Sequence, residues 1–139
     1  MNDNRAPVFV DTNIWLYMLD ESDEVKQNLS KRLINKNAVV ITTQILNEIS
    51  VNLIKKYGYT ELMIRGFVQK IYEKYKVVEV DAKTFNTASL FREKYSFGYW
   101  DSIVMAAAYE AGAAMVYSDK IKDGLVIEGR LGVINPYKF

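Results

Sequence analysis

Short runs of apolar, often β-branched residues alternate along this chain with longer segments in which apolar residues recur every three or four positions. The first pattern is typical of buried strands, and the second of helices that pack against them. Strands are expected at residues 8–11, 38–42, 76–80, 114–117 and 131–134. Helices are expected at residues 13–19, 24–36, 43–56, 60–75, 81–94 and 100–111. This alternation predicts an α/β fold, a three-layer α/β/α sandwich around a central parallel sheet of four to five strands.

Capping residues and apolar stripes refine these boundaries. Thr43 is expected to cap the helix that runs to about Lys56, and Gly58 to end it. The next helix is expected to start at Thr60. Its apolar stripe consists of Leu62, Met63, Phe67, Ile71 and Tyr75.

The size and composition suit a single domain over residues 1–139, with residues 1–6 as a loose tail. Half of the residues are apolar and 25% are charged, as in ordinary globular proteins. The first residues lack the apolar stretch of a signal peptide, and no segment is apolar enough to span a membrane. A cytoplasmic protein is therefore expected.

The residue types that are missing restrict the possible chemistry. The chain has no cysteine and no histidine, which excludes disulfides, thiolate or imidazole metal ligands and a histidine-based catalytic triad. Carboxylates remain, and they are ligands of hard cations such as Mg²⁺ and Mn²⁺. The net charge is only +1, so contact with nucleic acid would depend on local clusters of Lys and Arg.

Four acidic residues occupy corresponding places in the predicted fold. Asp11 ends the first strand and Asp119 follows the fourth. Glu48 and Asp101 lie in the first turns of two helices. Because the carboxyl ends of parallel strands share one edge of the sheet, these acids can converge there. Asn13 and Ser118, each close to one of these acids in sequence, can hold a water molecule or a phosphate.

Each acid alone also has an ordinary structural explanation. Asp11 can cap a helix, and Asp101 can stabilise a helix N-terminus. Glu48 can be a solvated helix residue, and Asp119 a turn residue. Taken together, clustered carboxylates repel one another and persist around a cation, so the set favours a metal site. Hydrolysis of a phosphodiester by metal-activated water follows as the simplest chemistry.

This ordered set of segments resembles the PIN domain, in particular the VapC-like toxin ribonucleases of type II toxin–antitoxin systems. The resemblance covers residues 8–139. It rests on Val10-Asp11-Thr12-Asn13, Gln44-Ile45-Leu46-Asn47-Glu48, Tyr99-Trp100-Asp101-Ser102-Ile103-Val104, Tyr117-Ser118-Asp119 and Val133-Ile134-Asn135-Pro136-Tyr137.

The resemblance implies that Asp11, Glu48 and Asp101 match the first three acids of the family's metal site, with Asn13 and Ser118 as supporting residues. It implies endonucleolytic cleavage of RNA that depends on Mg²⁺ or Mn²⁺ as cofactor. It also implies a homodimer that a cognate antitoxin protein holds inactive.

The fourth acidic position departs from the family pattern. The similar subgroup reads Ser-Glu-Asp where this chain reads Ser118-Asp119-Lys120, so Lys120 stands where the family has its Asp. The fourth metal ligand is then Asp119, the nearby Asp123, or absent. A Lys120 ammonium at the place of a metal ion would weaken ion binding.

Binding of RNA would need cations and stacking surfaces. Tyr99 and Trp100 are candidates for stacking bases, although Trp100 is expected in the core. The helices of residues 43–75 are candidates for a dimer surface or an antitoxin groove. The candidate cations are Lys26, Lys31, Arg32, Lys36, Lys55, Lys56, Arg65 and Lys70.

Three other interpretations compete with an active nuclease. The first is an inactive PIN-type module that binds RNA or protein, with Lys120 as the disabling change. The second is an aspartate-based phosphatase or a receiver-like domain. Asn13 stands where a phosphatase needs its second Asp, and the paired acids of a receiver are absent after the first strand. The third, a purely structural α/β protein, leaves the four acids unexplained.

Overall fold

The computed structural model describes residues 5–138, which form one six-stranded sheet and six helices. The strands are β1 (Pro7–Val10), β2 (Ala38–Thr42), β3 (Lys76–Val78), β4 (Met115–Tyr117), β5 (Val126–Ile127) and β6 (Leu131–Ile134). The helices are α1 (Thr12–Leu19), α2 (Glu24–Lys36), α3 (Thr43–Tyr57), α4 (Glu61–Lys74), α5 (Ala82–Tyr95) and α6 (Tyr99–Glu110). The predicted α/β fold with a mostly parallel sheet is confirmed.

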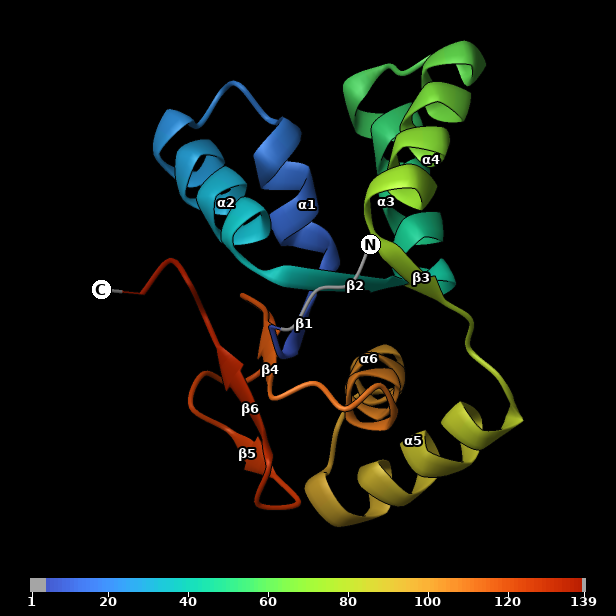
Figure 1. Cartoon of the computed structure of the whole chain (residues 1–139), viewed down its shortest axis with the longest axis vertical. Coiled ribbons are helices and arrows are strands. Elements are labelled where there is room, and N and C mark those ends of the chain that lie inside the picture. The colour runs from blue at the N-terminus through green and yellow to red at the C-terminus, as the bar shows by residue number, and fades with distance from the viewer. Residues whose placement is uncertain (1–4, 139) are drawn as a thin grey trace.

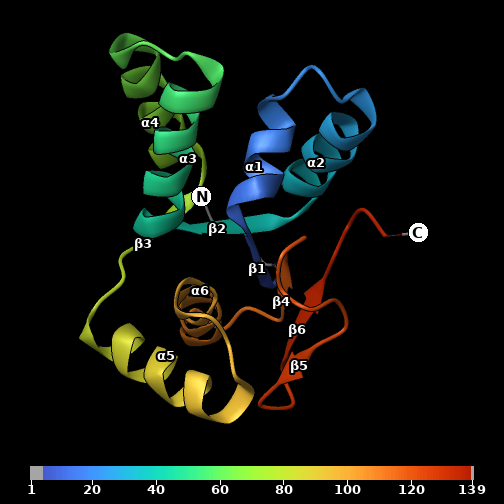
Figure 2. The same ribbon diagram turned by 180° about the vertical axis from the view of Figure 1, so that it is seen from behind.

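The strand order, β3-β2-β1-β4-β6-β5, explains the placement of the helices. From β1 to β2 to β3 the chain moves in one direction, and from β3 to β4 it returns to the other side of β1. Right-handed crossovers then require helices α1 to α4 on one face and α5 and α6 on the other. Figures 1 and 2 show this arrangement from both sides, with α1–α4 above the sheet and α5–α6 below it.

The described residues form six strands, one more than the upper end of the predicted range of four to five. β5 is antiparallel to β6 and is not among the strands expected from the sequence. A strand of two residues is too short to leave an alternating pattern in the sequence. All other strand pairs are parallel, so the carboxyl ends of β1, β2 and β4 meet at one edge.

The core lies on both faces of the central strands. Phe9 and Val10 of β1 are fully buried, as is Val116 of β4. The run of alanines in α6 allows this helix to lie close to the sheet. Trp15 of α1 is also fully buried, and its indole N–H donates to the Val10 carbonyl at 3.0 Å. This bond fixes the start of α1 against the end of β1, where Asp11 lies.

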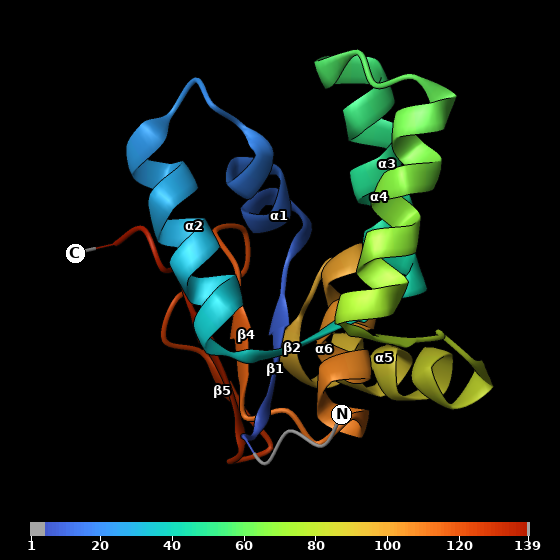
Figure 3. The same ribbon diagram turned by 45° about the horizontal axis from the view of Figure 1, so that its top comes forward.

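The ends of α3 agree with the sequence except for the capping residue. Thr42 caps the helix in place of Thr43, because its hydroxyl accepts the Ile45 N–H at 3.0 Å. Gly58 ends the helix as expected, with a positive φ of 67° that favours glycine. The following turn brings α4 back beside α3 as an antiparallel hairpin (Figure 3).

One apolar stripe is only partly covered, and one prediction about an apolar side chain was wrong. Leu62 and Met63 are exposed at the start of α4, so only the later part of its stripe faces the protein. Trp100 was expected in the core, but it is 63% exposed. Apolar character alone does not distinguish a buried first turn from an exposed one.

The N-terminal tail is only partly described. Of the predicted loose tail, residues 1–4 lie outside the described residues. The Arg5 guanidinium donates to the carbonyl of Lys36. No helix within residues 5–138 is long and apolar enough to cross a membrane.

Candidate active site

Asp11 lies directly after β1, and its surroundings are compatible with both of the roles considered from the sequence. It is the N-cap of α1, and its Oδ1 accepts the Thr12 N–H at 2.8 Å. Its other oxygen, Oδ2, accepts the Ser118 hydroxyl at 2.8 Å. The side chain is only 2% exposed, so these two donors stabilise a buried carboxylate. Cap and site are therefore compatible for this residue.

Ser118 connects the ends of two neighbouring strands. It follows β4, which pairs with β1, and it is fully buried. Its Oγ donates to Asp11 and accepts the backbone N–H groups of Lys120 at 3.0 Å and Ile121 at 3.1 Å. One hydroxyl thus orients the carboxylate and shapes the loop after β4.

Glu48 is held in position from two sides. Oε2 of Glu48 accepts the Thr12 hydroxyl at 2.8 Å, and Oε1 accepts the Gln44 side-chain amide at 3.2 Å. Because Thr12 also gives its N–H to Asp11, this residue links two of the predicted acids. The hydrogen bond from the Thr12 hydroxyl to Glu48 therefore joins α1 to α3 at the edge of the sheet.

Asp101, in the first turn of α6, is electrostatically coupled to the other two acids. Burial raises the pKa of Asp101, and the negative charge of Asp11 raises it further, as does that of Glu48. The ammonium of Lys120 opposes them and lowers the pKa. Asp11, Glu48 and Lys120 therefore all lie near enough to Asp101 for their charges to act on it.

Asp119 faces a different set of partners. One carboxylate oxygen accepts the Asn13 amide at 3.2 Å, and the other accepts the Tyr17 hydroxyl at 3.0 Å. Burial and the bond to Asp119 raise the pKa of Tyr17 to about 12. Lys26 lies over the Tyr17 ring, 4.5 Å from its centroid. Both Asp119 oxygens are engaged by α1, so its role as fourth ligand remains a prediction.

The other candidates near the fourth position differ in their surroundings. Asp123 accepts the backbone N–H of Asn135 at 2.8 Å, so it stabilises the loop beside β6. Lys120 lines the same cavity as Glu48. Lysine, not a carboxylate, is therefore the additional charged residue beside the three coupled acids.

The donor chemistry of this centre fits a hard divalent cation. Asp11, Glu48 and Asp101 offer carboxylate oxygens, which Mg²⁺ and Mn²⁺ prefer, and their mutual repulsion favours a bound cation. Among residues 5–138, no three acidic side chains lie close enough together to enclose an ion as they stand. Asp101 and Glu48 are only partly buried, so an ion from solution can reach both carboxylates.

A groove of about 720 Å³ lies on the side of α3 that faces away from the cavity lined by Glu48 and Lys120. It is larger than that cavity. Its wall includes Tyr99 and Trp100, from the turn that carries Asp101, and also Tyr72 and Phe85. Gln44 also lines it, which places an amide beside the aromatic rings. The groove therefore adjoins the carboxylate centre and offers exposed aromatic faces.

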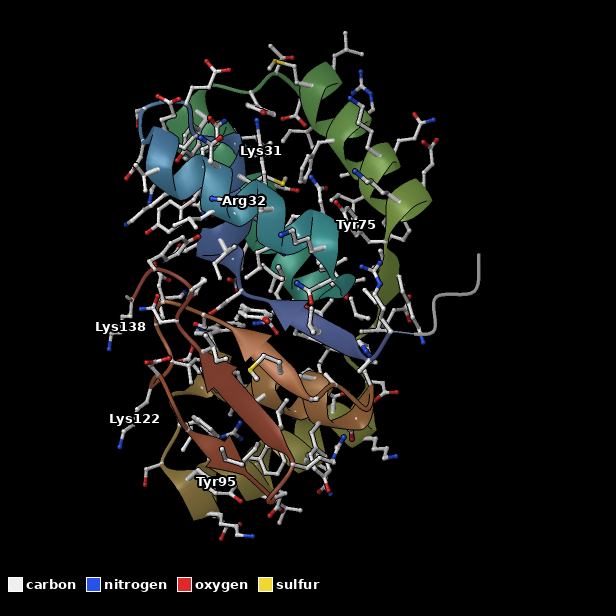
Figure 4. The ribbon with its side chains drawn as sticks, turned by 60° about the vertical axis from the view of Figure 1, so that its left-hand side comes forward. Lys31, Arg32, Tyr75, Tyr95, Lys122 and Lys138 are labelled. Carbon is white, nitrogen blue, oxygen red and sulfur yellow. The ribbon has the colours of Figure 1, made fainter. Side chains whose placement is uncertain are left out.

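Most of the cations considered from the sequence lie elsewhere. Among them, Lys31 and Arg32 lie on α2 (Figure 4). The same view shows Lys122 and Lys138, which were not candidates, beside the C-terminal strands. Lys56 is different, because it lines the cavity that contains Glu48 and Lys120. Lys56, one of the eight candidate cations, therefore lies beside an acid of the centre.

The sequence interpretation missed three residues of the centre. Thr12 and Tyr17 were not singled out, although each bonds to one of the predicted acids. Gln44 was also missed, but its position four residues before Glu48 on one helix was a usable signal. Nothing in the sequence pointed to Tyr17, whose partner is 102 residues away.

The fold and this edge of the sheet define a parallel α/β domain with a carboxylate centre. A family model described as PIN domain matches residues 8–122, and the chain belongs to this family. No curated protein sequence gives a significant match.

Solved structures with the same fold are remote in sequence. A toxin–antitoxin complex from Klebsiella pneumoniae contains a chain that is 19% identical, with a TM-score of 0.73, and the match covers 95% of this chain and 99% of that one. VapC20 of Mycobacterium tuberculosis, titled as a sarcin–ricin loop cleaving toxin, is 19% identical with a TM-score of 0.66, over 80% of this chain and 88% of that one. A chain of VapBC2 from Rickettsia felis, bound to a DNA fragment from its promoter, is 17% identical with a TM-score of 0.66, over 91% and 96%. At these identities the likeness establishes the fold.

Proposed function

We propose that this chain is a metal-dependent endoribonuclease of the VapC-like toxin type. In this proposal Asp11, Glu48 and Asp101 hold Mg²⁺ or Mn²⁺ and the substrate is RNA. The observation that carries it is the grouping of these acids at one edge of the sheet, where Thr12 bonds to both Asp11 and Glu48 and the charges of both act on Asp101. The chain has no histidine or cysteine to support another hydrolytic centre.

The side chains around the acids prepare them for this chemistry. A bound divalent cation supplies Lewis acidity, which polarises the phosphoryl group and activates water. Ser118 and Thr12 donate to Asp11 and Glu48 and so keep their remaining lone pairs directed to the centre. The Asp119 carboxylate holds the Asn13 amide beside them, where it can donate to a phosphate oxygen.

Single-stranded RNA suits the surroundings of the centre best. The Trp100 side chain is 63% exposed and that of Tyr99 50%, and both line the groove next to Asp101. Bases in single strands stack on exposed aromatic rings, whereas bases in a duplex are already stacked on each other. These two rings are therefore proposed to hold a base beside the cleaved bond.

We further propose an antitoxin partner and a homodimer in the cytoplasm. The solved structures with this fold include toxin–antitoxin complexes, among them those from Klebsiella pneumoniae and Rickettsia felis. Exposed apolar side chains on the α3–α4 hairpin, Val51, Ile54, Leu62 and Met63, support a protein interface there.

A second candidate function is a PIN-type binding module without nuclease activity. Lys120 favours it, because its positive charge already acts on Asp101 in the absence of any ion. In that case wild-type protein would fail to bind Mn²⁺, and Lys120→Ala would bind it. The active nuclease predicts Mn²⁺ binding by both proteins.

Cleavage of a mixed RNA pool by the purified chain tests the proposal. We expect cleavage with Mg²⁺ or Mn²⁺, none with EDTA, and none by Asp11→Asn or Asp101→Asn. Glu93→Gln, which changes an exposed acid on α5, is the matched control and should cleave like the wild type. Equal cleavage by the wild type and both Asp variants would refute the proposal.

A further inference from the structure

A second cavity, of about 370 Å³, lies between the start of α1 and the face of α3 that carries Glu48 and Asn52. It is within the range of about 300–1,000 Å³ that is usual for small-ligand sites. Its wall contains three amides, two ammonium groups and one carboxylate, from Asn13, Asn47, Asn52, Lys56, Lys120 and Glu48. Its chemistry is therefore polar, in contrast to the aromatic groove on the other side of α3.

The two lysines give this cavity an excess of positive charge. Within residues 5–138 neither Lys56 nor Lys120 is in a salt bridge, whereas Lys94 pairs with Glu128 at 2.7 Å. The lining has two ammonium groups and one carboxylate, that of Glu48, so it carries one excess positive charge. The cavity can therefore accommodate negative charge from a ligand.

The position of Lys120 is fixed by the active centre itself. Its backbone N–H donates to the Ser118 hydroxyl, and this hydroxyl donates to Asp11. Lys56, on the last turn of α3, lies two helical turns from Glu48 along the same helix. The two ammonium groups thus approach the cavity from two different elements, one of which is anchored to a proposed metal ligand.

The amides add donors that can bind anion oxygens. Asn13 gives one N–H to Asp119, and Asn52 gives one to the Glu48 carbonyl at 2.8 Å. Each amide nitrogen carries two hydrogens, so each of these residues keeps one for a ligand. Asn47 is exposed, and it lines both this cavity and the aromatic groove.

We propose that this cavity binds a backbone phosphate of single-stranded RNA, with Lys56 and Lys120 as its cations and the asparagines as its hydrogen-bond donors. The choice of RNA rests on the proposed nuclease function, whereas the preference for an anion rests on the cavity alone. Asn47 connects the two grooves, so the backbone lies on one side of α3 and a base on the other. Lys120, at the altered fourth acidic position, then serves the substrate.

The dependence of RNA binding on salt tests this assignment directly. Binding of a short, fluorescently labelled single-stranded RNA pool to the full chain is measured by anisotropy in EDTA over a range of salt concentrations. Each phosphate contact on a single strand contributes about 0.7 to the slope of log K against log salt. Lys56→Gln and Lys120→Gln should each reduce the slope by about 0.7, and the double variant by about 1.4.

Two neighbouring lysines provide matched controls. Lys55→Gln changes the adjacent residue of α3 and Lys122→Gln a nearby loop residue, with the same loss of charge at exposed positions outside the cavity. Both should keep the wild-type slope. Thermal unfolding of all four variants verifies that the fold is intact.

Three results would overturn the assignment: equal slopes for all four variants and the wild type, no RNA binding, or equally tight binding of an oligo-glutamate peptide. The last result would indicate an acidic protein segment as the ligand. RNA cleavage is not part of this measurement. A chain that never cleaves RNA can therefore still confirm the phosphate site, and an active nuclease can still refute it.

Discussion

Replacing Ser118 by Ala should weaken both the fold and the active centre. The hydroxyl is fully buried and takes part in three hydrogen bonds. Its donation to the Asp11 carboxylate is a bond to a charged group, for which about 1.5–3 kcal/mol is typical. The variant also leaves the backbone N–H groups of Lys120 and Ile121 without their acceptor, and Ile121 is a buried residue.

The sum of these losses gives the expected magnitude. We expect the free energy of unfolding to fall by about 3 kcal/mol, with the larger share from the buried carboxylate. For a domain of this size that corresponds to a fall in Tm of roughly 10 °C. Because Ser118 also orients Asp11, Mn²⁺ affinity should fall by about 10-fold or more.

Urea unfolding of the metal-free protein and Mn²⁺ titration measure the two effects. Ser89→Ala, at an exposed position of α5, is the control and should stay within about 0.5 kcal/mol of the wild type. A Ser118→Ala protein as stable as this control would show that the Ser118–Asp11 bond does not hold the two strand ends together.

Three further predictions concern the groups around the centre. Thr12→Val keeps the shape of a buried side chain but removes the hydroxyl that donates to Glu48. The Mn²⁺ affinity measured by calorimetry should therefore fall by about 10-fold, and the circular dichroism spectrum should not change. An unchanged affinity would count against the Thr12–Glu48 link. Burial and Asp11 raise the pKa of Asp101, so the folded state holds this proton more tightly than the unfolded chain does. The stability of the metal-free protein should therefore decrease as pH rises through this pKa, and Asp101→Asn, compared by urea unfolding across pH, should lose that part of the decrease. A pH profile identical to that of the wild type would refute it. Tyr17 has its pKa raised from 10.0 to about 12, so its stabilising contribution should disappear as pH rises across that interval. Tyr17→Phe should remove one late step from the tyrosinate absorbance titration, and an unchanged titration would contradict the Tyr17–Asp119 bond.

The parts of the site that were visible in the sequence are those set by local pattern. Asp11 could be predicted because an apolar strand ends in an acid, and the place of Glu48 and Asp101 followed from helices that begin at the same sheet edge. This topology brings the ends of strands together, so it also predicted the proximity of these acids.

The remaining features depend on contacts that no local pattern records. The bonds of Asp119 to Asn13 and Tyr17 join residues more than 100 positions apart. The exposure of Trp100 depends on where the first turn of α6 lies relative to α3 and α5, which share a groove with it. Apolar character alone is compatible with both a core and a binding surface.

Titration of the metal-free chain with Mn²⁺, followed by electron paramagnetic resonance, tests the central claim most directly. The proposed centre predicts binding by the wild type, loss of binding in Asp11→Asn and Asp101→Asn, and unchanged binding in Asp123→Asn, whose carboxylate bonds to the Asn135 backbone. Asp119→Asn in the same series decides the fourth ligand. Wild-type affinity in both Asp11→Asn and Asp101→Asn would contradict the claim that these carboxylates form one metal site.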